Sequence, residues 1–258
     1  MPKKFVLLLV ALLLVVTLVG VIFVRTETAR IEAETFRNLE GVVSLKTQQV
    51  ENWLYERDGD CRALMGSENL VLRLQRFLHN PDDETEHRIM QGRLNVLINA
   101  YSYDSVVLVN AQAKVVLAVG EHVAIEPAAA ALLQRALSER RPVHGDLYRD
   151  TAGTIHMDWV APLLLPDAQG GRVIAAVLLR TDPQRFLYPM LAQWPTASRT
   201  AETLIVRREG DSLLALNELR MRKDSALSFR LPLSTPELPA AASILTAEPG
   251  TMQGRDYR

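Results

Sequence analysis

The feature that most constrains this chain is an uncharged, almost wholly apolar run from Phe5 to Val24. A helix of about twenty residues, at 1.5 Å per residue, spans the hydrocarbon core of a bilayer, and this run has that length. Lys3 and Lys4 precede the run and Arg25 follows it. Because paired lysines favour the cytoplasmic side, we expect residues 1–25 to form a cytoplasmic tip and a transmembrane anchor.

A cleaved signal peptide is the alternative interpretation of this segment. It would need a short apolar core and a small-x-small cleavage site. Here the core is long, and Gly20 is followed by the apolar residues 21–24. The sequence therefore favours an uncleaved anchor in the cell inner membrane, with one visible pass and the bulk of the chain periplasmic or otherwise extracytoplasmic.

Composition argues against several classes of protein. Charged residues make up 23% of the chain and the net charge is −1, so the sequence lacks the basic character of a nucleic-acid binder. Cys61 is the one cysteine, which rules out an intrachain disulfide, and we expect it to be a buried structural thiol. No nucleophile elbow or pair of carboxylates at a cleft is recognisable. We expect neither enzymatic activity nor a cofactor.

The region after the anchor, residues 26–100, predicts long helices that would form a stalk. Residues 27–65 contain no proline and are rich in good helix formers. Apolar residues recur there at three-four spacing: Phe36, Leu39, Val43, Val50 and Trp53. Such a seam either pairs with a second copy, as in a coiled coil, or packs on its own domain. Both alternatives stay open, because Lys46 and Arg57 interrupt the seam.

Glycines and cap residues predict where these helices end. Gly59 and Gly66 are the expected bends in the stalk. A second helix is expected over residues 68–79, before Asn80-Pro81, and a third over residues 84–100 after an aspartate cap.

The next region, residues 101–182, changes to the periodicity of strands. The strand-like runs are 105–109, 114–119, 143–149, 154–161 and 172–181, with a helix at 127–139 and turn residues at 166–171. This order predicts an α+β module with an antiparallel five-stranded sheet and helices on one face.

After residue 182 the order of helix and strand-like runs begins again. A linker helix is expected within residues 183–200. A hairpin (202–207 and 212–216), a strand (226–231) and a short helix (238–245) follow within residues 201–258. These runs are too few to complete a second sheet, so we expect a truncated second module and regard the chain as the front piece of a longer protein.

This layout resembles the double CACHE sensor regions of bacterial transmembrane receptors. The stretch 182–196, which starts Asp-Pro-Gln-Arg-Phe-Leu-Tyr-Pro, looks like the linker between their modules, and so do residues 201–211 and 216–220. The resemblance implies tandem PAS-like antiparallel modules on a long stalk helix. It also implies a second transmembrane helix beyond residue 258, followed by histidine-kinase or GGDEF/EAL output.

The resemblance further implies a small-ligand site in the cup between the sheet of the first module and the helix that crosses it. The predicted lining residues are Tyr101, Tyr148, His156, Asp158, Arg180 and Asp182. Strand alternation places His156 and Asp158 on one face and Trp159 on the other. Asp158 or Asp182 would suit an amine, and Arg180 a carboxylate. The alternative is that these polar residues simply face water.

The ligand class is left open by the sequence. The amino-acid-binding subset of the family carries a tyrosine, an arginine and a Trp-Tyr pair before a late aspartate, and only Asp182 has an obvious counterpart here. The five histidines lack metal-ligand spacing, although His144 with Asp146 and His156 with Asp158 would meet if they lay on adjacent strands. We therefore expect no metal site.

These patterns together predict the ligand-sensing region of a membrane receptor used in signal transduction. The expected partners are an unknown small molecule, the membrane and a second copy of the chain bound through the stalk helix, with no nucleic acid. The alternative is a membrane-anchored scaffold or partner-binding module without signalling.

Overall fold

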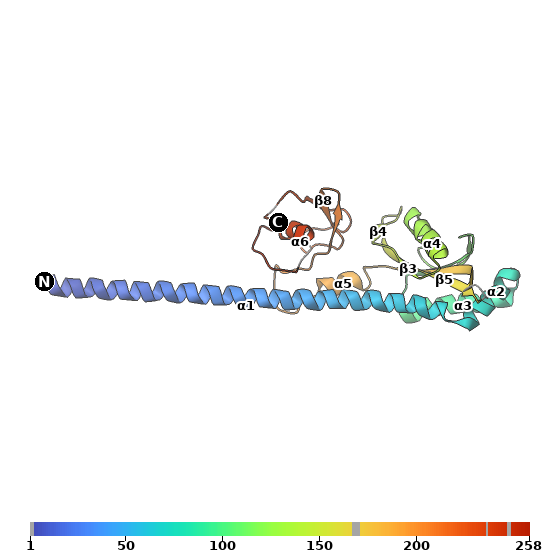
Figure 1. Cartoon of the computed structure of the whole chain (residues 1–258), viewed down its shortest axis with the longest axis horizontal. Helices are drawn as coiled ribbons and strands as arrows, with labels where there is room; N and C mark the ends of the chain where they lie inside the picture. The colour runs from blue at the N-terminus through green and yellow to red at the C-terminus, as the bar shows by residue number, and fades with distance from the viewer. Residues whose placement is uncertain (1–2, 167–170, 236, 247–248) are drawn as a thin grey trace.

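The computed structural model describes residues 3–166, 171–235, 237–246 and 249–258. One helix, α1 (Lys3–Met65), runs the length of the molecule, and the two modules lie along one side of it (Figure 1). In the described residues it is the one helix that is long and apolar enough to cross a membrane. The chain turns at Gly66 as expected, but the bend predicted at Gly59 is wrong, because α1 continues through it.

Two shorter helices follow α1, and both begin at a side-chain cap. The hydroxyl of Ser67 accepts a hydrogen bond from the Leu70 N–H at the start of α2 (Glu68–His79). The carboxylate of Asp83 accepts from two backbone N–H groups at the start of α3 (Glu84–Tyr101). These caps satisfy donors that have no partner within the helix, which fixes where each helix begins.

The first module is an antiparallel sheet of six strands. They are β1 (Ser105–Asn110), β2 (Val115–Gly120), β3 (Val143–His144), β4 (Tyr148–Arg149), β5 (Ile155–Leu165) and β6 (Arg172–Thr181). The strand order is β2-β1-β6-β5-β3, and β4 also pairs with β5. The turn expected at 166–171 includes residues 167–170, which lie outside the described residues.

The expected single strand over residues 143–149 is divided into β3 and β4. Gly145 still donates its N–H to the Asp158 carbonyl, at 2.9 Å. The next two residues then leave the ladder, and the Asp146 carboxylate accepts the Leu147 N–H instead. An insertion of this kind bends a strand and redirects the side chains that follow it. Here it sets the position of Tyr148.

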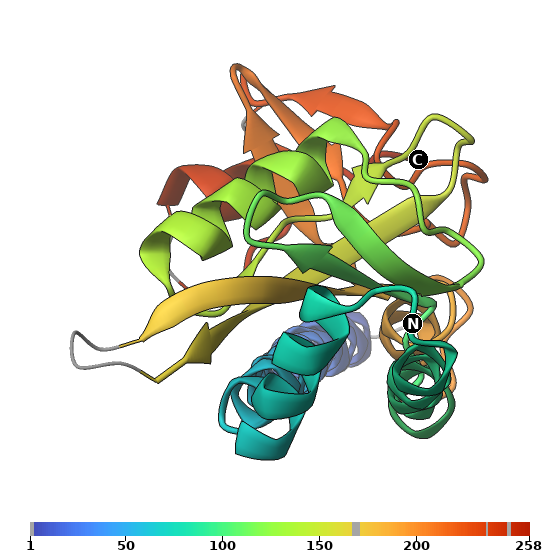
Figure 2. The ribbon, with the colours of Figure 1, turned by 90° about the vertical axis from the view of Figure 1, so that its right-hand side faces the viewer.

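Helices cover both faces of this sheet, so the prediction of helices on one face is wrong. Helices α1, α2 and α3 pack on one face, and α4 (Pro127–Glu139) packs on the other (Figure 2). The reason is visible in β5, where Trp159 and Val160, which point to opposite faces, are both fully buried. Strands that are buried on both sides carry continuous apolar runs.

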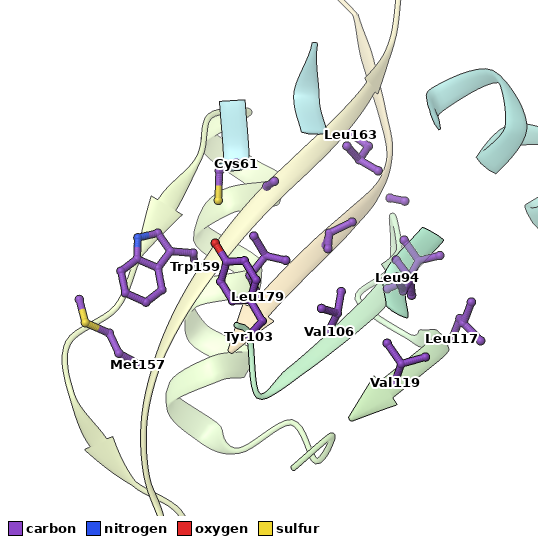
Figure 3. Packing of buried hydrophobic residues seen from close by; sticks show 14 of the residues in the cluster. Cys61, Leu94, Tyr103, Val106, Leu117, Val119, Met157, Trp159, Leu163 and Leu179 are labelled. Atoms are coloured by element: carbon purple, nitrogen blue, oxygen red, sulfur yellow. The ribbon is translucent and has the colours of Figure 1, made fainter. Parts of the chain in front are cut away.

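The face toward the stalk is held by large aromatic and aliphatic side chains, including Trp159, Tyr103 and Leu179 (Figure 3). Trp53 of α1 meets Trp159 edge-to-face, with ring centroids 5.3 Å apart. Cys61 lies in the same core without exposure, and burial raises its pKa to about 12. The thiol is therefore protonated and structural, as its helical position predicts.

The apolar seam of the stalk was expected either to pair with a second copy or to pack on its own domain, and its residues differ in this respect. Val50 and Trp53 pack on the chain's own core, whereas Val43 is exposed. Lys46 is buried, and its ammonium donates to the Met190 carbonyl, at 2.5 Å, near the end of α5 (Leu187–Ala192). Burial lowers the pKa of Lys46. The stalk thus holds the linker helix as well as the first module.

The second module has a three-stranded antiparallel sheet in the described residues, of β7 (Val206–Glu209), β8 (Ser212–Ala215) and β9 (Arg230–Pro232), with α6 (Pro239–Thr246) against it. Arg149 donates to the Ala226 carbonyl at 2.7 Å. Arg207 donates to the Leu147 carbonyl at 3.3 Å and pairs with Asp146 at 2.8 Å. The bulged segment around Tyr148 is therefore bonded on both sides to the second module.

Candidate functional site

A row of polar side chains crosses the first sheet near one end. The strand register aligns Ser105 on β1, Arg180 on β6 and Asp158 on β5. Because side chains alternate along a strand, these residues face α4, as do Val160 and Leu178. The apolar core under α4 is thus closed at one end by buried polar groups.

Arg180 and Asp158 form the centre of this row, and each side chain is 1% exposed. The guanidinium meets the carboxylate through two parallel bonds, Nε to Oδ1 at 2.9 Å and Nη2 to Oδ2 at 3.0 Å. Such bidentate, charge-assisted hydrogen bonds are stronger than hydrogen bonds between neutral groups. Burial alone would lower the pKa of Arg180, but Asp158 raises it, so the guanidinium stays charged.

The other donors of Arg180 are also used. Nη1 donates to the carbonyls of His122, at 2.6 Å, and Ala124, at 2.9 Å. Nη2 donates to the Tyr148 hydroxyl at 2.8 Å. All five N–H groups of the guanidinium therefore have acceptors within the protein. A ligand that binds Arg180 has to displace one of these partners.

Tyr148 connects the ion pair to the bulged segment. Its hydroxyl donates to Asp158 Oδ2 at 2.7 Å while it accepts from Arg180. Burial, and then the negative charge of Asp158, raise the pKa of the phenol well above its usual range. Tyr148 is consequently a neutral donor.

His156 completes what we call the buried polar cluster: Tyr148, His156, Asp158 and Arg180. The imidazole has no exposure, and its Nε2 lies 2.9 Å from Asp150 Oδ2. Burial alone would raise the pKa of Asp150, but hydrogen bonds from His156 and the Thr154 N–H outweigh it and lower the pKa. In the described part of the chain, His156 Nδ1 has no hydrogen-bond partner.

Asp182 lies at the border of this cluster and joins it indirectly. Its carboxylate caps the following turn, accepting the Gln184 N–H at 2.8 Å, and lies 3.7 Å from Arg185. Arg185 also contacts Asp104 Oδ1 at 3.2 Å, and Asp104 Oδ2 lies 2.8 Å from His122 Nδ1. The rings of His122 and His156 are 5.0 Å apart.

Sequence reasoning missed Asp104 and His122, although a signal existed. Asp104 directly precedes β1 and His122 follows shortly after β2. Because an antiparallel hairpin brings the start of its first strand beside the end of its second, the two residues are neighbours.

Two other expectations are not met by the geometry. Tyr101 lies at the end of α3, on the stalk side of the sheet, and is 44% exposed. Its backbone carbonyl accepts a hydrogen bond from Arg57. His144 does not meet His156, because it lies on the stalk-facing side of the sheet. Its ring centroid is 6.0 Å from that of Trp159, and its Nδ1 is hydrogen-bonded to Asp58. Asp146 pairs with Arg207 of the second module.

A hollow of about 360 Å³ lies elsewhere, between the stalk and the second module. Its lining includes Leu39, Trp194, Glu202 and Tyr257. The hydroxyl of Tyr257 donates to Glu202 at 2.6 Å across one part of it. This hollow is separate from the buried polar cluster.

No protein-family model and no curated protein sequence matches the chain. Among solved structures it is similar to the ligand-binding domain of the amino acid chemoreceptor PctC of Pseudomonas aeruginosa PAO1, in complex with GABA. That likeness has a TM-score of 0.50 and 15% identity, and it covers 86% of each chain. The chain therefore shares the fold of that ligand-binding domain.

Two further structures are similar at lower scores. One is a domain of a sensory box/GGDEF family protein from Vibrio parahaemolyticus, with a TM-score of 0.46, 10% identity, and coverage of 74% of this chain and 93% of that one. The other is the extracellular domain of a histidine kinase, with a TM-score of 0.43, 10% identity, and coverage of 69% and 84%.

Proposed function

We propose that this chain is the extracytoplasmic, small-ligand-sensing part of a membrane-bound signalling receptor. The observation that carries the proposal is the buried polar cluster on the α4-facing side of the sheet, in a fold shared with a chemoreceptor ligand-binding domain. The ligand in that neighbour carries an amine and a carboxylate, which supports a small polar ligand here. In this proposal the chain has no catalytic activity, and output modules lie beyond it.

The proposed anchor is the apolar first part of α1. Its side chains are exposed in the structure, as expected for a segment whose partner is lipid. With Lys4 at the cytoplasmic end, both modules would lie outside the inner membrane. We propose that two copies associate through the stalk surface that carries the exposed Val43.

The mechanism follows from the occupied donors of Arg180. A ligand carboxylate would displace the carbonyls of His122 and Ala124 from Nη1 and so shift the segment that carries them. A ligand amine would compete for Asp158 and so release Tyr148. The bonds of Leu147 and Arg149 to the second module would then pass a movement of Tyr148 to that module. Signalling requires that the ligand binds the two arrangements with different affinity.

A thermal-shift screen of the full chain in detergent, using amines, organic acids and amino acids, tests the proposal. A ligand that binds only the folded state stabilises it by about 2.7 kcal/mol at a hundredfold excess over its Kd. Tyr148→Phe removes one hydroxyl from the cluster, and we expect it to weaken binding by about tenfold or more.

Tyr101→Phe is the matched control, because the same hydroxyl is removed from an exposed tyrosine on the stalk side. We expect the control to bind like the original chain. A ligand whose affinity is unchanged by Tyr148→Phe, or lowered by Tyr101→Phe alone, would place the site elsewhere. Absence of any stabilising ligand across the screen would count against small-molecule sensing and favour a partner-binding scaffold.

A further inference from the structure

A second group of side chains at the end of the β1–β2 hairpin has the composition of a metal site. Asp104, Glu121 and His122 each offer a ligand atom, and these atoms all lie within 4.8 Å of one another. Two carboxylates and an imidazole suit Zn²⁺ and similar first-row divalent ions. The mechanism proposed above uses only the His122 carbonyl.

The backbone brings these residues together through Gly120. It pairs with Ser105 in the hairpin register and has a φ of +105°. A Cβ at this position would lie 2.4 Å from the Asp104 carbonyl oxygen, so only glycine permits this approach. The two residues after Gly120 are thereby held beside Asp104.

The ligand groups are fixed in advance by their neighbours. The His122 carbonyl accepts from the Ser105 hydroxyl at 2.8 Å and from Arg180, which holds its main chain. Arg185 contacts Asp104 at Oδ1, whereas Oδ2 faces His122. The Asp104 carboxylate is 1% exposed, and Glu121 is exposed. The group is therefore anchored on its buried side and reachable from solvent.

Within the described residues, the neighbouring His156 has a buried ring nitrogen without a hydrogen-bond partner. Its Nε2 bonds to the Asp150 carboxylate, while Nδ1 is buried and has no partner among the described residues. Histidines that bind metals commonly give their other ring N–H to a carboxylate, which leaves a lone pair on the remaining nitrogen. The ring lies 5.0 Å from that of His122. Leaving such a buried nitrogen unpaired is otherwise costly.

We propose that Asp104, Glu121 and His122 bind a divalent first-row metal, zinc in the first instance. A set of three protein ligands keeps a position open for water or an exogenous ligand. The site is distinct from the ion pair of Arg180 and Asp158. It stands whether or not the chain senses a small molecule.

Equilibrium dialysis of the full chain against Zn²⁺, after chelator treatment and without a histidine tag, tests the site by elemental analysis. We expect about one zinc ion per chain. Glu121→Gln and His122→Gln should each weaken binding by about tenfold or more. Glu121 is exposed, so Glu121→Gln preserves the fold, and circular dichroism verifies this for both variants.

His144→Gln is the matched control. His144 also contacts an aspartate, Asp58, at 3.2 Å, but it is not part of the three-ligand group. We expect its zinc affinity to equal that of the original chain. The proposal is overturned if the original chain retains no zinc, or if Glu121→Gln and His122→Gln retain as much as His144→Gln.

Discussion

The two faces of the first sheet do different work with the same six strands. The stalk-facing side is almost wholly apolar and meets α1, α2 and α3 over a broad surface. The α4-facing side is apolar only under the helix and ends in buried charges. The stalk-facing side is stabilised by a large buried apolar area, and many combinations of apolar residues can supply such an area. The α4-facing side depends on a few directional hydrogen bonds that must all be satisfied.

The largest expected effect is on the stalk-facing side. Trp159→Ala would remove a fully buried indole that contacts Trp53, and we expect a loss of about 3–5 kcal/mol of unfolding free energy. Urea denaturation measures it. Tyr55 lies on α1, as Trp53 does, but is 72% exposed, and Tyr55→Ala should change the unfolding free energy by no more than about 0.5 kcal/mol. Equal losses would show that this face does not hold the module on the stalk.

A somewhat smaller loss, about 3 kcal/mol, is expected when the charge pair on the other face is broken. Asp158→Ala leaves the Arg180 guanidinium buried without its carboxylate. The double variant Asp158→Leu with Arg180→Met removes both charges and should recover part of the loss, as unfolding midpoints will show. A double variant less stable than Asp158→Ala would mean that the remaining bonds of Arg180, not the unpaired charge, dominate.

The smallest expected effect is the pH dependence of the stability that the Asp150 carboxylate contributes. The pKa of Asp150 is lowered in the folded state, so its contribution is fully present above its unfolded pKa of about 3.9 and is lost as pH falls toward the folded value. Asp150→Asn should therefore cost about 1 kcal/mol at pH 6 and less at pH 3. Chemical denaturation at both values measures this. A difference that grows in acid would reverse the assigned sign.

The sequence predicted the elements of this fold well because their signals are local. The cap at Asp83 and the β-branched run from Ser105 to Val109 need no knowledge of the partner elements. The continuous apolar run from Val173 to Leu179 also contained the information that both faces of β6 are covered, although we expected helices on one face only.

The site was less accessible to sequence reasoning. Alternation correctly put His156 and Asp158 on one face, but the bulge between β3 and β4 puts Tyr148 on that face while His144 lies on the other. A one-residue change of register moves every following side chain across a sheet. The proximity of Asp104 and His122 depends on the hairpin register, which shifts between Leu108 and Val109.

The buried thiol of Cys61 has a practical consequence for labelling and crosslinking experiments. Maleimides and oxidants react with accessible thiolates. The Cys61 thiol has no exposure and a pKa of about 12, so we expect it to react with neither. The chain therefore behaves chemically as though it had no cysteine. A single cysteine placed at an exposed stalk position such as Val43 will be the sole point of labelling or crosslinking. The proposed association of two copies can thus be tested by crosslinking without first altering the core.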